Sequence, residues 1–292
     1  MLRSELFRGN ARLERCAVDH AHHVVRGNKG DFVSKIQEAL VMLDNTILTG
    51  TDVSSQTYGN PTAEAVLAYK TARNIVNRSY QSVPDNIVGI MTINRMDQEM
   101  AELEARMPDM IQRARVGGFQ RTFSAFMQVV GIGPPPPPGR VDQIRAENQR
   151  RARELAVAIF NNPNPDMDDI GSVLGDMKNR IAAPSVPIER AHFPDPRCGN
   201  RDAFVVGNRV PIFLCPRFFG GSDEQRIRTF IHESAHLTGI GDPDGEAYYL
   251  LFNSQNEDPQ IVFNTPRSTN RADFADTWAK YVNAVTRQPP DR

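Results

Sequence analysis

The sequence has no long apolar run and few cysteines, and these two absences exclude several kinds of protein. No stretch of about 18 consecutive apolar residues occurs, so we expect no membrane span. The 3 cysteines among 292 residues are too few for a small protein held together by disulfides. The first residues, 1–9, contain neither an apolar segment nor a cleavage site, so we expect no conventional signal peptide.

The sequence also lacks an excess of charge of either sign. Its 34 Lys and Arg residues nearly balance its 35 Asp and Glu residues, which gives a formal net charge of -1 at pH 7. Proteins that bind nucleic acid draw much of their affinity from clustered cations, so we expect no nucleic-acid partner. Apolar residues make up 40% of the 292 residues, which is enough to bury the cores of two domains.

A run of five prolines between two glycines, at residues 133–139, is the clearest boundary in the chain. Consecutive prolines cannot continue a helix and favour a stiff polyproline II spacer. We therefore predict four segments: an N-terminal segment 1–27, a helical domain 28–104, a linker 105–139 that ends in the proline run, and a second domain 140–292.

Three amphipathic helices are predicted before the linker. The first has one apolar stripe at helical spacing, formed by Val33, Ile36, Leu40 and Leu43. The second begins at Asn60, where Pro61 takes the first helical position. The third begins near Thr92 and repeats the apolar spacing at Ile93, Met96, Met100 and Leu103. The spacing therefore predicts an all-α bundle of three helices.

The same segments resemble a peptidoglycan-binding domain of the common three-helix bacterial type. That family opens with Gly-Asp-x-Val-x-x-x-Gln-x-x-Leu and continues with Tyr/Phe-Gly-x-x-Thr-x-x-Ala-Val and Ile-Val-Gly-x-x-Thr. The resemblance covers about residues 28–100 and is carried by Gly30, Val33, Gln37, Leu40, Tyr58, Gly59, Thr62, Ala65, Val66, Val88, Gly89 and Thr92. It implies peptidoglycan as a partner, although the insert 77–84 departs from the family pattern.

Helices and short strands are predicted after the linker. Residues 141–160 form a helical stretch rich in Arg and Glu. Two short apolar runs, 203–206 and 210–214, flank Gly207 and Asn208 and read as a tight hairpin. Pro211 cannot donate a ladder hydrogen bond, so we expect its strand at the edge of a sheet, where the chain near Ile212 would pair with an extended substrate.

The decisive motif is His-Glu-x-x-His at residues 232–236. On a helix, His232 and His236 lie one turn apart on the same face, and this spacing lets both imidazoles bind one Zn²⁺. Glu233 is placed to act as the general base on the attacking water. Ser222 with Gln225 forms a capping-box pattern before this helix, and Gly239 is expected to end it.

The C-terminal part, about residues 190–285, resembles the deuterolysin and lysine-specific metallo-endopeptidase family, the aspzincins. The resemblance is carried by the segments IFLCPRFF, IHESAHL and RADFADTWAKYV and by an acidic loop that ends in tyrosine. That family takes its third zinc ligand from an Asp in Gly-Thr-x-x-Asp-x-x-Tyr-Gly. Here the threonine is missing, and Glu246 stands three residues before Tyr249.

The third ligand therefore has more than one candidate. We favour Glu246, while Asp242 would give a spacing similar to that of metzincins with Asp in place of the last His, and Asp244 is a further alternative. Tyr249 or Tyr248 could donate a hydrogen bond to the developing oxyanion. Each of these residues also has a plain structural interpretation, as a helix cap or as a packed aromatic ring.

The cysteines leave the redox environment open. Cys198 and Cys215 flank the predicted hairpin, so they could form a disulfide, which would indicate an oxidising destination. Two buried free thiols are the alternative. In either case Cys16 has no cysteine partner.

We therefore predict a two-domain protein, with an all-α three-helix bundle followed by an α+β zincin-like domain. Its expected activity is that of a zinc metalloendopeptidase directed to the cell wall, which could be a secreted effector or toxin. A peptidoglycan stem-peptide hydrolase is the alternative within the enzyme class, and a non-catalytic wall-binding protein with a degenerate zincin domain is the alternative outside it. The expected destination is periplasmic or extracellular by a specialised route, with a cytoplasmic location as the alternative.

Overall fold

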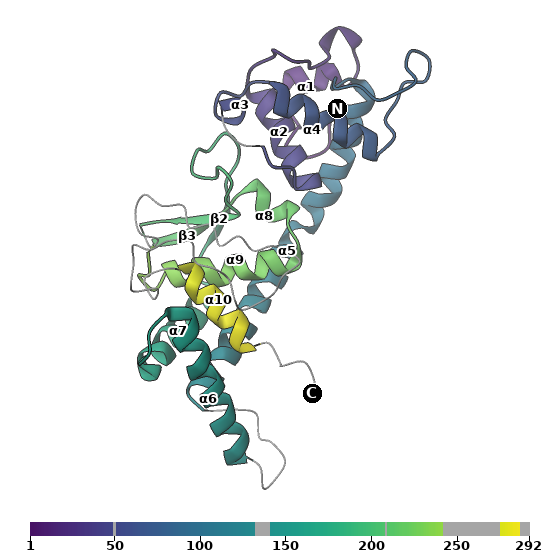
Figure 1. Cartoon of the computed structure of the whole chain (residues 1–292). Coiled ribbons are helices and arrows are strands. Elements are labelled where there is room, and N and C mark those ends of the chain that lie inside the picture. The colour runs from purple at the N-terminus through teal and green to yellow at the C-terminus, as the bar shows by residue number, and fades with distance from the viewer. Residues whose placement is uncertain (49–50, 132–140, 208, 242–274, 287–292) are drawn as a thin grey trace. The chain divides into compact units, whose positions relative to one another are not determined.

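The computed structural model describes residues 1–48, 51–131, 141–207, 209–241 and 275–286, and it is mostly helical with one small sheet (Figure 1). The helices are α1 (Ala11–Cys16), a 3-10 helix (His20–His22), α2 (Asp31–Asp44), α3 (Thr51–Ser54), α4 (Asn60–Ala72), α5 (Ile90–Val129), α6 (Val141–Phe160), α7 (Met167–Ala182), α8 (Pro216–Gly220), α9 (Asp223–His236) and α10 (Ala275–Thr286). The strands are β1 (Ile188–Arg190), β2 (Ala203–Val206) and β3 (Arg209–Leu214).

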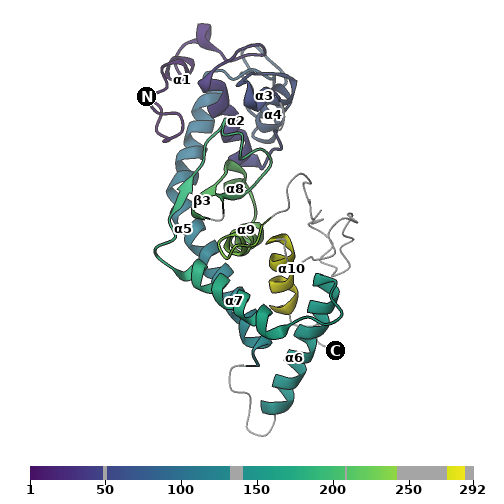
Figure 2. The same cartoon turned by 90° about the vertical axis from the view of Figure 1, so that its left-hand side faces the viewer.

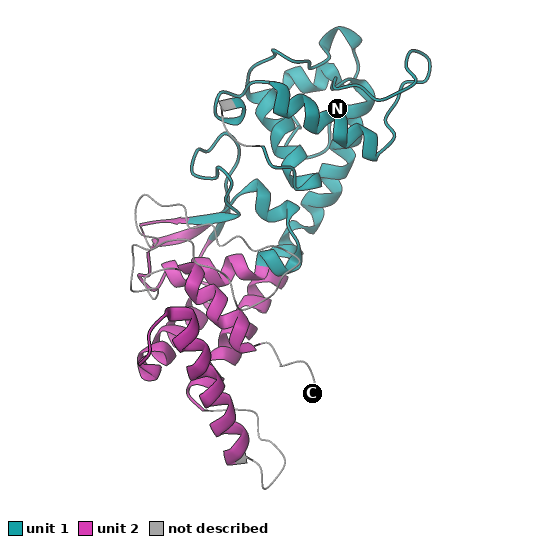
Figure 3. Cartoon of the chain, in the orientation of Figure 1, with its two compact units in different colours: residues 1–112, 188–204, 213–226 teal, residues 113–187, 205–212, 227–292 magenta. Residues whose placement is uncertain are grey.

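The chain divides into two compact units, shown in different colours in Figure 3. Unit 1 comprises residues 1–112, 188–204 and 213–226, and unit 2 comprises residues 113–187, 205–212 and 227–292. These units follow different boundaries from the predicted domains. The first division falls inside α5, a single helix of 40 residues that occupies most of the predicted linker 105–139. The proline run itself lies outside the described residues.

The three helices predicted before the linker are confirmed as α2, α4 and the first part of α5. Their apolar stripes are buried, with Val33, Ile36, Leu40 and Ile93 all inaccessible to solvent. The amide of Gln37 is also buried, and its Nε2 donates to the carbonyl O of Thr57 at 3.0 Å and to Oγ1 of Thr62 at 2.9 Å. Gln37 therefore ties α2 to the start of α4, which gives this motif residue a structural role.

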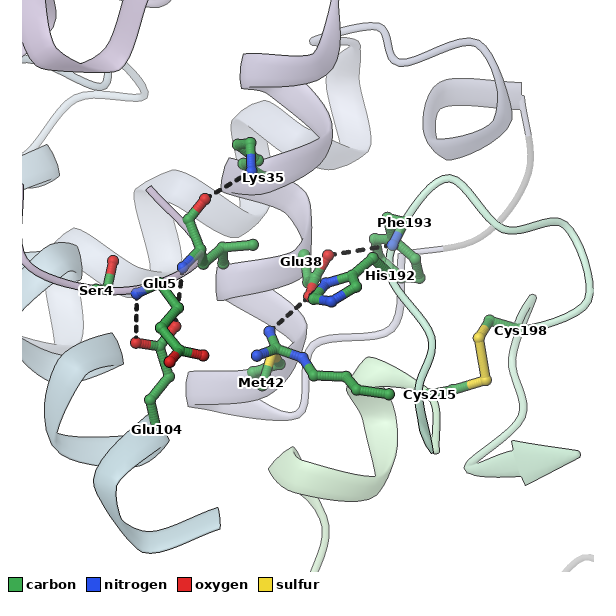
Figure 4. Close-up of polar contacts among 12 residues, drawn as sticks. Ser4, Glu5, Lys35, Glu38, Met42, Glu104, His192, Phe193, Cys198 and Cys215 are labelled. Atoms are coloured by element: carbon green, nitrogen blue, oxygen red, sulfur yellow. Dashed lines mark hydrogen bonds and ion pairs between the residues drawn. A yellow bond between two sulfur atoms is a disulfide. The ribbon is translucent and has the colours of Figure 1, made fainter. Parts of the chain in front are cut away.

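The N-terminal segment is part of unit 1 because α5 holds it by two carboxylates. Asp97 accepts hydrogen bonds from the backbone N–H groups of Arg3 and Ser4 at 2.9 Å. Glu104 accepts from the backbone N–H groups of Glu5 at 2.6 Å and Leu6 at 3.0 Å (Figure 4). The start of the N-terminal segment is thus packed on α5.

A second segment of unit 1 comes from the predicted C-terminal domain, and Glu38 on α2 anchors it. The Glu38 carboxylate is almost completely buried. It accepts hydrogen bonds from Arg190 Nη2 at 2.8 Å, from His192 Nδ1 at 2.9 Å and from the backbone N–H of Phe193 at 3.1 Å (Figure 4). α8 also packs on α2, so closely that a Cβ added at Gly220 would overlap the carbonyl O of Val41.

Cys198 and Cys215 form a disulfide, which decides between the two alternatives left open by the sequence (Figure 4). Their Cα atoms lie 5.5 Å apart, within the usual range for disulfides. The bond closes a loop that contains β2 and β3. Cys16 is buried elsewhere in unit 1, and burial raises the pKa of its thiol to about 11.

The small sheet corrects one prediction. Its strand order is β1-β3-β2, so β3, which contains Pro211, is the central strand and not an edge strand. Ile212 and Leu214 face β1, and backbone groups alternate in direction along a strand, so the missing N–H of Pro211 faces β2 and the pairing of β3 with β1 does not need it. Ile212 donates its N–H to Pro187 O at 3.1 Å, and Ala191 donates to Leu214 O at 2.9 Å. The chain near Ile212 is therefore already paired and is no free edge for a substrate.

Unit 2 has a core formed by the second part of α5 together with α6, α7, α9 and α10. The ring of Phe160 on α6 contacts both Trp278 and Tyr281 on α10, with ring centroids 4.8 Å and 5.1 Å apart. None of the helices in the described part of the chain combines the length and the apolar character that a membrane span requires.

Candidate metal centre

The helix that carries His232 and His236 forms as the sequence predicts. The capping box is present, because Ser222 N–H donates to Gln225 Oε1 at 2.8 Å and Gln225 N–H donates to Ser222 Oγ at 3.2 Å. Two reciprocal bonds of this kind satisfy N–H groups that a helix start otherwise leaves unpaired. On its other side, Phe230 and Ile231 are buried in unit 2.

Two glycines of α5 let α9 approach closely. A Cβ added at Gly117 would lie 2.6 Å from Ile227 Cδ1, and one at Gly118 would lie 3.2 Å from Phe230 Cβ and 3.5 Å from Ile227 O. The absence of side chains at Gly117 and Gly118 therefore sets the depth at which α9 lies in unit 2. The role of this pair was not predictable from the sequence, because two glycines within a long helical pattern carry no signal of what packs on them.

The imidazoles of His232 and His236 meet on one face of α9. Their Nε2 atoms lie 3.0 Å apart, with ring centroids 4.7 Å apart. Two nitrogen ligands at about 2.0–2.1 Å from a tetrahedral zinc ion are themselves about 3.3 Å apart. The two Nε2 atoms therefore stand close to the separation that one zinc ion requires.

The opposite nitrogens of the two rings are each bound to an acceptor. His232 Nδ1 lies 2.7 Å from Asp276 Oδ1, and His236 Nδ1 lies 2.9 Å from the carbonyl O of Ile240. Figures 1 and 2 show α10, which carries Asp276, beside α9. A carboxylate and a carbonyl only accept, so each Nδ1 carries the proton of its ring.

This arrangement has a direct electrostatic consequence. In the neutral rings each Nε2 then presents a lone pair, and the two lone pairs of His232 and His236 face one another at 3.0 Å. Two acceptors at this separation repel unless a cation lies between them. A proton or a metal ion can serve, and neutral imidazole nitrogens with fixed tautomers are preferred ligands of zinc.

The end of α9 explains the bond to Ile240. Gly239 has φ of +96°, which side chains disfavour, and it ends the helix as predicted. The reversal lets Ile240 N–H donate to Ala235 O at 3.3 Å. It also turns the carbonyl of Ile240 back onto His236.

Glu233 lies next to the paired imidazoles. Its side chain is almost completely buried, and Oε1 is 4.0 Å from His232 Nε2. A carboxylate at this distance can reach a water molecule bound near the two Nε2 atoms, and its burial keeps bulk water from competing. The geometry thus fits the predicted general base.

The other predicted site residues cannot be compared with the structure. Glu246, Asp242, Asp244, Tyr248 and Tyr249 all lie outside the described residues. Within the described ranges no three His, Cys, Asp or Glu side chains gather as a potential metal site. Of the predicted site residues, the structure describes His232, Glu233 and His236, which are neighbours on α9 but do not by themselves make up such a group.

Asp276 is the residue of this site that sequence reasoning missed. It lies in the segment RADFADTWAKYV, which the sequence analysis used only as part of a resemblance. One signal was present, because Asp276 is an acidic residue in the first turn of a helix whose next turns are apolar. Nothing in the spacing, however, relates Asp276 to a histidine 44 residues earlier.

Comparison of the chain with protein-family models, with curated proteins and with solved structures finds no match.

Proposed function

We propose that this protein is a zinc-dependent peptidase whose metal lies between His232 and His236. The observation that carries the proposal is the pair of Nε2 atoms that face one another at 3.0 Å while both Nδ1 atoms are held by acceptors. The alternative of a degenerate, non-catalytic domain is less well supported, because the two Nε2 atoms lie 3.0 Å apart and Glu233 Oε1 lies 4.0 Å from His232 Nε2. The third ligand in this proposal is Glu246, with Asp242 as the alternative.

Each residue of the proposed site has a separate role in the reaction. Zinc, when bound, polarises the scissile carbonyl and lowers the pKa of the attacking water. Glu233 accepts the proton of that water and delivers it to the leaving amine nitrogen. His232 and His236 hold their lone pairs toward one point, and Tyr249 or Tyr248 is proposed to donate to the developing oxyanion.

Peptidoglycan is the proposed partner of the helical bundle in unit 1. The support is the resemblance of residues 28–100 to a peptidoglycan-binding domain, together with the three helices found where it expects them. The disulfide between Cys198 and Cys215 supports an oxidising destination, so we place the protein in the periplasm or outside the cell.

The test of the metal site is metal analysis of the full chain purified without chelator. We expect about one zinc ion per chain, and we expect His232→Ala to lose it. Glu233→Gln should retain zinc and lose about 10²-fold or more of the peptidase activity, since an amide cannot accept the proton. Glu224→Gln, on the same helix, is the matched control and should retain both properties. A wild-type chain that holds no transition metal would contradict the proposal.

The substrate is tested by offering casein and purified murein sacculi to the same preparation. Release of peptides from casein supports a protein endopeptidase, and release of stem peptides from sacculi supports the murein hydrolase alternative. Co-sedimentation of the Glu233→Gln variant with intact sacculi tests the binding module without digestion of the ligand. Absence of co-sedimentation would remove peptidoglycan as the partner and leave the metal site unaffected.

A further inference from the structure

We infer that Asp276, which α10 holds beside His232, is a positioning residue for the metal site. The inference rests on the proposed zinc site and deepens it, because it names what orients the first ligand. Asp276 Oδ1 lies 2.7 Å from His232 Nδ1, and the two side chains are 30% and 21% exposed. A contact of this length between a carboxylate and an imidazole N–H is a strong, charge-assisted hydrogen bond.

The contact acts on the metal through the imidazole. Because the carboxylate accepts from Nδ1–H, it selects the tautomer of His232 in which Nε2 carries the lone pair that a cation would bind. It also fixes the rotation of the ring, so less entropy is lost when a metal binds. Asp276 does not touch the metal in this scheme, since its carboxylate faces the opposite nitrogen of the ring.

The position of the carboxylate is fixed by the packing of α10. Trp278 and Tyr281 are buried in the core of unit 2. The hydroxyl of Tyr281 donates to Ala152 O on α6 at 3.0 Å, and Arg121 Nη1 on α5 donates to Asn283 Oδ1 at 3.1 Å. These contacts fix the rotation of α10 about its axis and its position along that axis. Asp276, in the first turn of α10, therefore has a defined place against α9.

His236 is oriented by different means. Its Nδ1 donates to a backbone carbonyl, that of Ile240, which the turn at Gly239 supplies. The two ligands thus depend on separate parts of the chain, one on a local turn and one on a helix that comes 44 residues after His232. A change at Asp276 should therefore weaken one ligand and leave the other in place.

A purely structural role for Asp276 must be separated from this one. Asp276 lies in the first turn of α10, where any carboxylate stabilises a helix through the helix dipole. Asp168 occupies the corresponding place in α7, is exposed and lies in the same unit. Asp168→Ala is therefore the matched control, because it removes a first-turn carboxylate from unit 2 without touching a histidine.

The deciding measurement is zinc affinity of the full chain, determined by competition with a chromogenic chelator. We expect Asp276→Ala to weaken zinc binding by about 10- to 100-fold. Asp276→Asn should weaken zinc binding by only about tenfold, because the amide oxygen still accepts from Nδ1–H but carries no charge. Asp168→Ala should bind zinc as the wild type does. If Asp276→Ala fails to fold, the isosteric Asn variant decides the outcome alone.

The tautomer gives a second readout that a helix-capping role would not change. In the zinc-free wild type, long-range ¹H–¹⁵N correlation spectra should show His232 with its proton on Nδ1. In Asp276→Ala the same ring should populate both tautomers, while His236 keeps its proton on Nδ1. An unchanged His232 spectrum, or zinc affinity within about twofold of the wild type, would overturn the inference.

Failure of this inference differs from failure of the proposed function. If His232→Ala still binds zinc as tightly as the wild type, the metal site itself is misplaced. If His232→Ala loses zinc and both Asp276 variants keep it, the metal site stands and only the positioning role is refuted.

Discussion

Glu38 in unit 1 and Asp276 in unit 2 each pair with the Nδ1 of a histidine on another segment, and the surroundings of these two pairs differ. In unit 1, Glu38 lies 2.9 Å from His192 Nδ1, and in unit 2, Asp276 lies 2.7 Å from His232 Nδ1. Glu38 is 1% exposed and also accepts from Arg190 and from the backbone of Phe193, whereas His192 is 53% exposed. The arrangement at Glu38 is thus a buried carboxylate surrounded by donors.

The second pair differs in what the other ring nitrogen faces. His232 turns its Nε2 toward Nε2 of His236, so the carboxylate of Asp276 directs a lone pair at another lone pair. The pairing of a carboxylate with an imidazole is therefore not by itself a sign of a metal site. What distinguishes unit 2 is a second imidazole, since Nε2 of His236 lies 3.0 Å from Nε2 of His232.

The largest effect should come from removing one of the facing nitrogens. His236→Ala should reduce zinc from about one ion per chain to near zero, since a single imidazole with its neighbours cannot complete a tetrahedral site. His192→Ala removes the histidine of the other pair and should leave the zinc content unchanged. Metal analysis after gel filtration measures both. Equal loss of zinc in the two variants would remove the distinction between the units.

Glu38→Ala should destabilise unit 1 strongly. Loss of a buried carboxylate leaves Arg190 without its anionic partner, and breaking such a pair costs about 3–5 kcal/mol. Urea denaturation followed by circular dichroism measures the free energy of unfolding. Glu64→Ala, an exposed glutamate on α4, is the control and should change it by less than about 0.5 kcal/mol. Stability equal to the wild type would show that Glu38 does not anchor the segment after β1.

The disulfide should stabilise the segment after β1 by a free energy comparable to that of the Glu38 contacts. Cys198 and Cys215 are 17 residues apart in the chain, and closing a loop of that length stabilises a protein by about 3 kcal/mol in the chain-entropy account. The double variant Cys198→Ser with Cys215→Ser should lose about this free energy of unfolding. In Cys16→Ala, the free energy of unfolding should still differ between the oxidised and the reduced protein, because Cys16 takes no part in the bond. Insensitivity of the wild type to reductant would contradict the prediction.

The smallest effect is expected at the start of α9. Ser222→Ala removes one half of the capping box and should cost about 1 kcal/mol. Ser222→Asp keeps an acceptor at the cap and should restore most of that loss. Thermal unfolding monitored at several wavelengths measures the change, and zinc affinity should stay near the wild-type value in both variants. A large fall in zinc affinity would mean that the cap, and not Asp276, controls the ligands.

The local features were predictable from the sequence because their causes lie within a few residues. The capping box at Ser222, the helix stop at Gly239 and the three apolar stripes before the linker all follow from short spacings. The strand order was not predictable in the same way. Pro211 removes a donor, but whether a further strand pairs with β3 depends on β1, a separate segment of the chain, and no local pattern reveals that pairing.

Long-range contacts account for the rest of what the sequence left open. Glu38 meets His192 across 154 residues, and Asp276 meets His232 across 44. In the sequence, nothing distinguishes either carboxylate from other acidic residues on helices. The closeness of α9 to α5 is hidden for the same reason, since Gly117 and Gly118 acquire meaning only when Ile227 and Phe230 pack on them.

The separation of His232 and Asp276 along the chain has a consequence for synthesis. Translation proceeds from the N-terminus, so α9 is made before the carboxylate that orients its first histidine, which follows 44 residues later. Until α10 has docked on α6, the ring of His232 lacks the carboxylate that would select its tautomer. In the proposed peptidase, the metal site would therefore stay incomplete, and the enzyme inactive, while the chain is still on the ribosome.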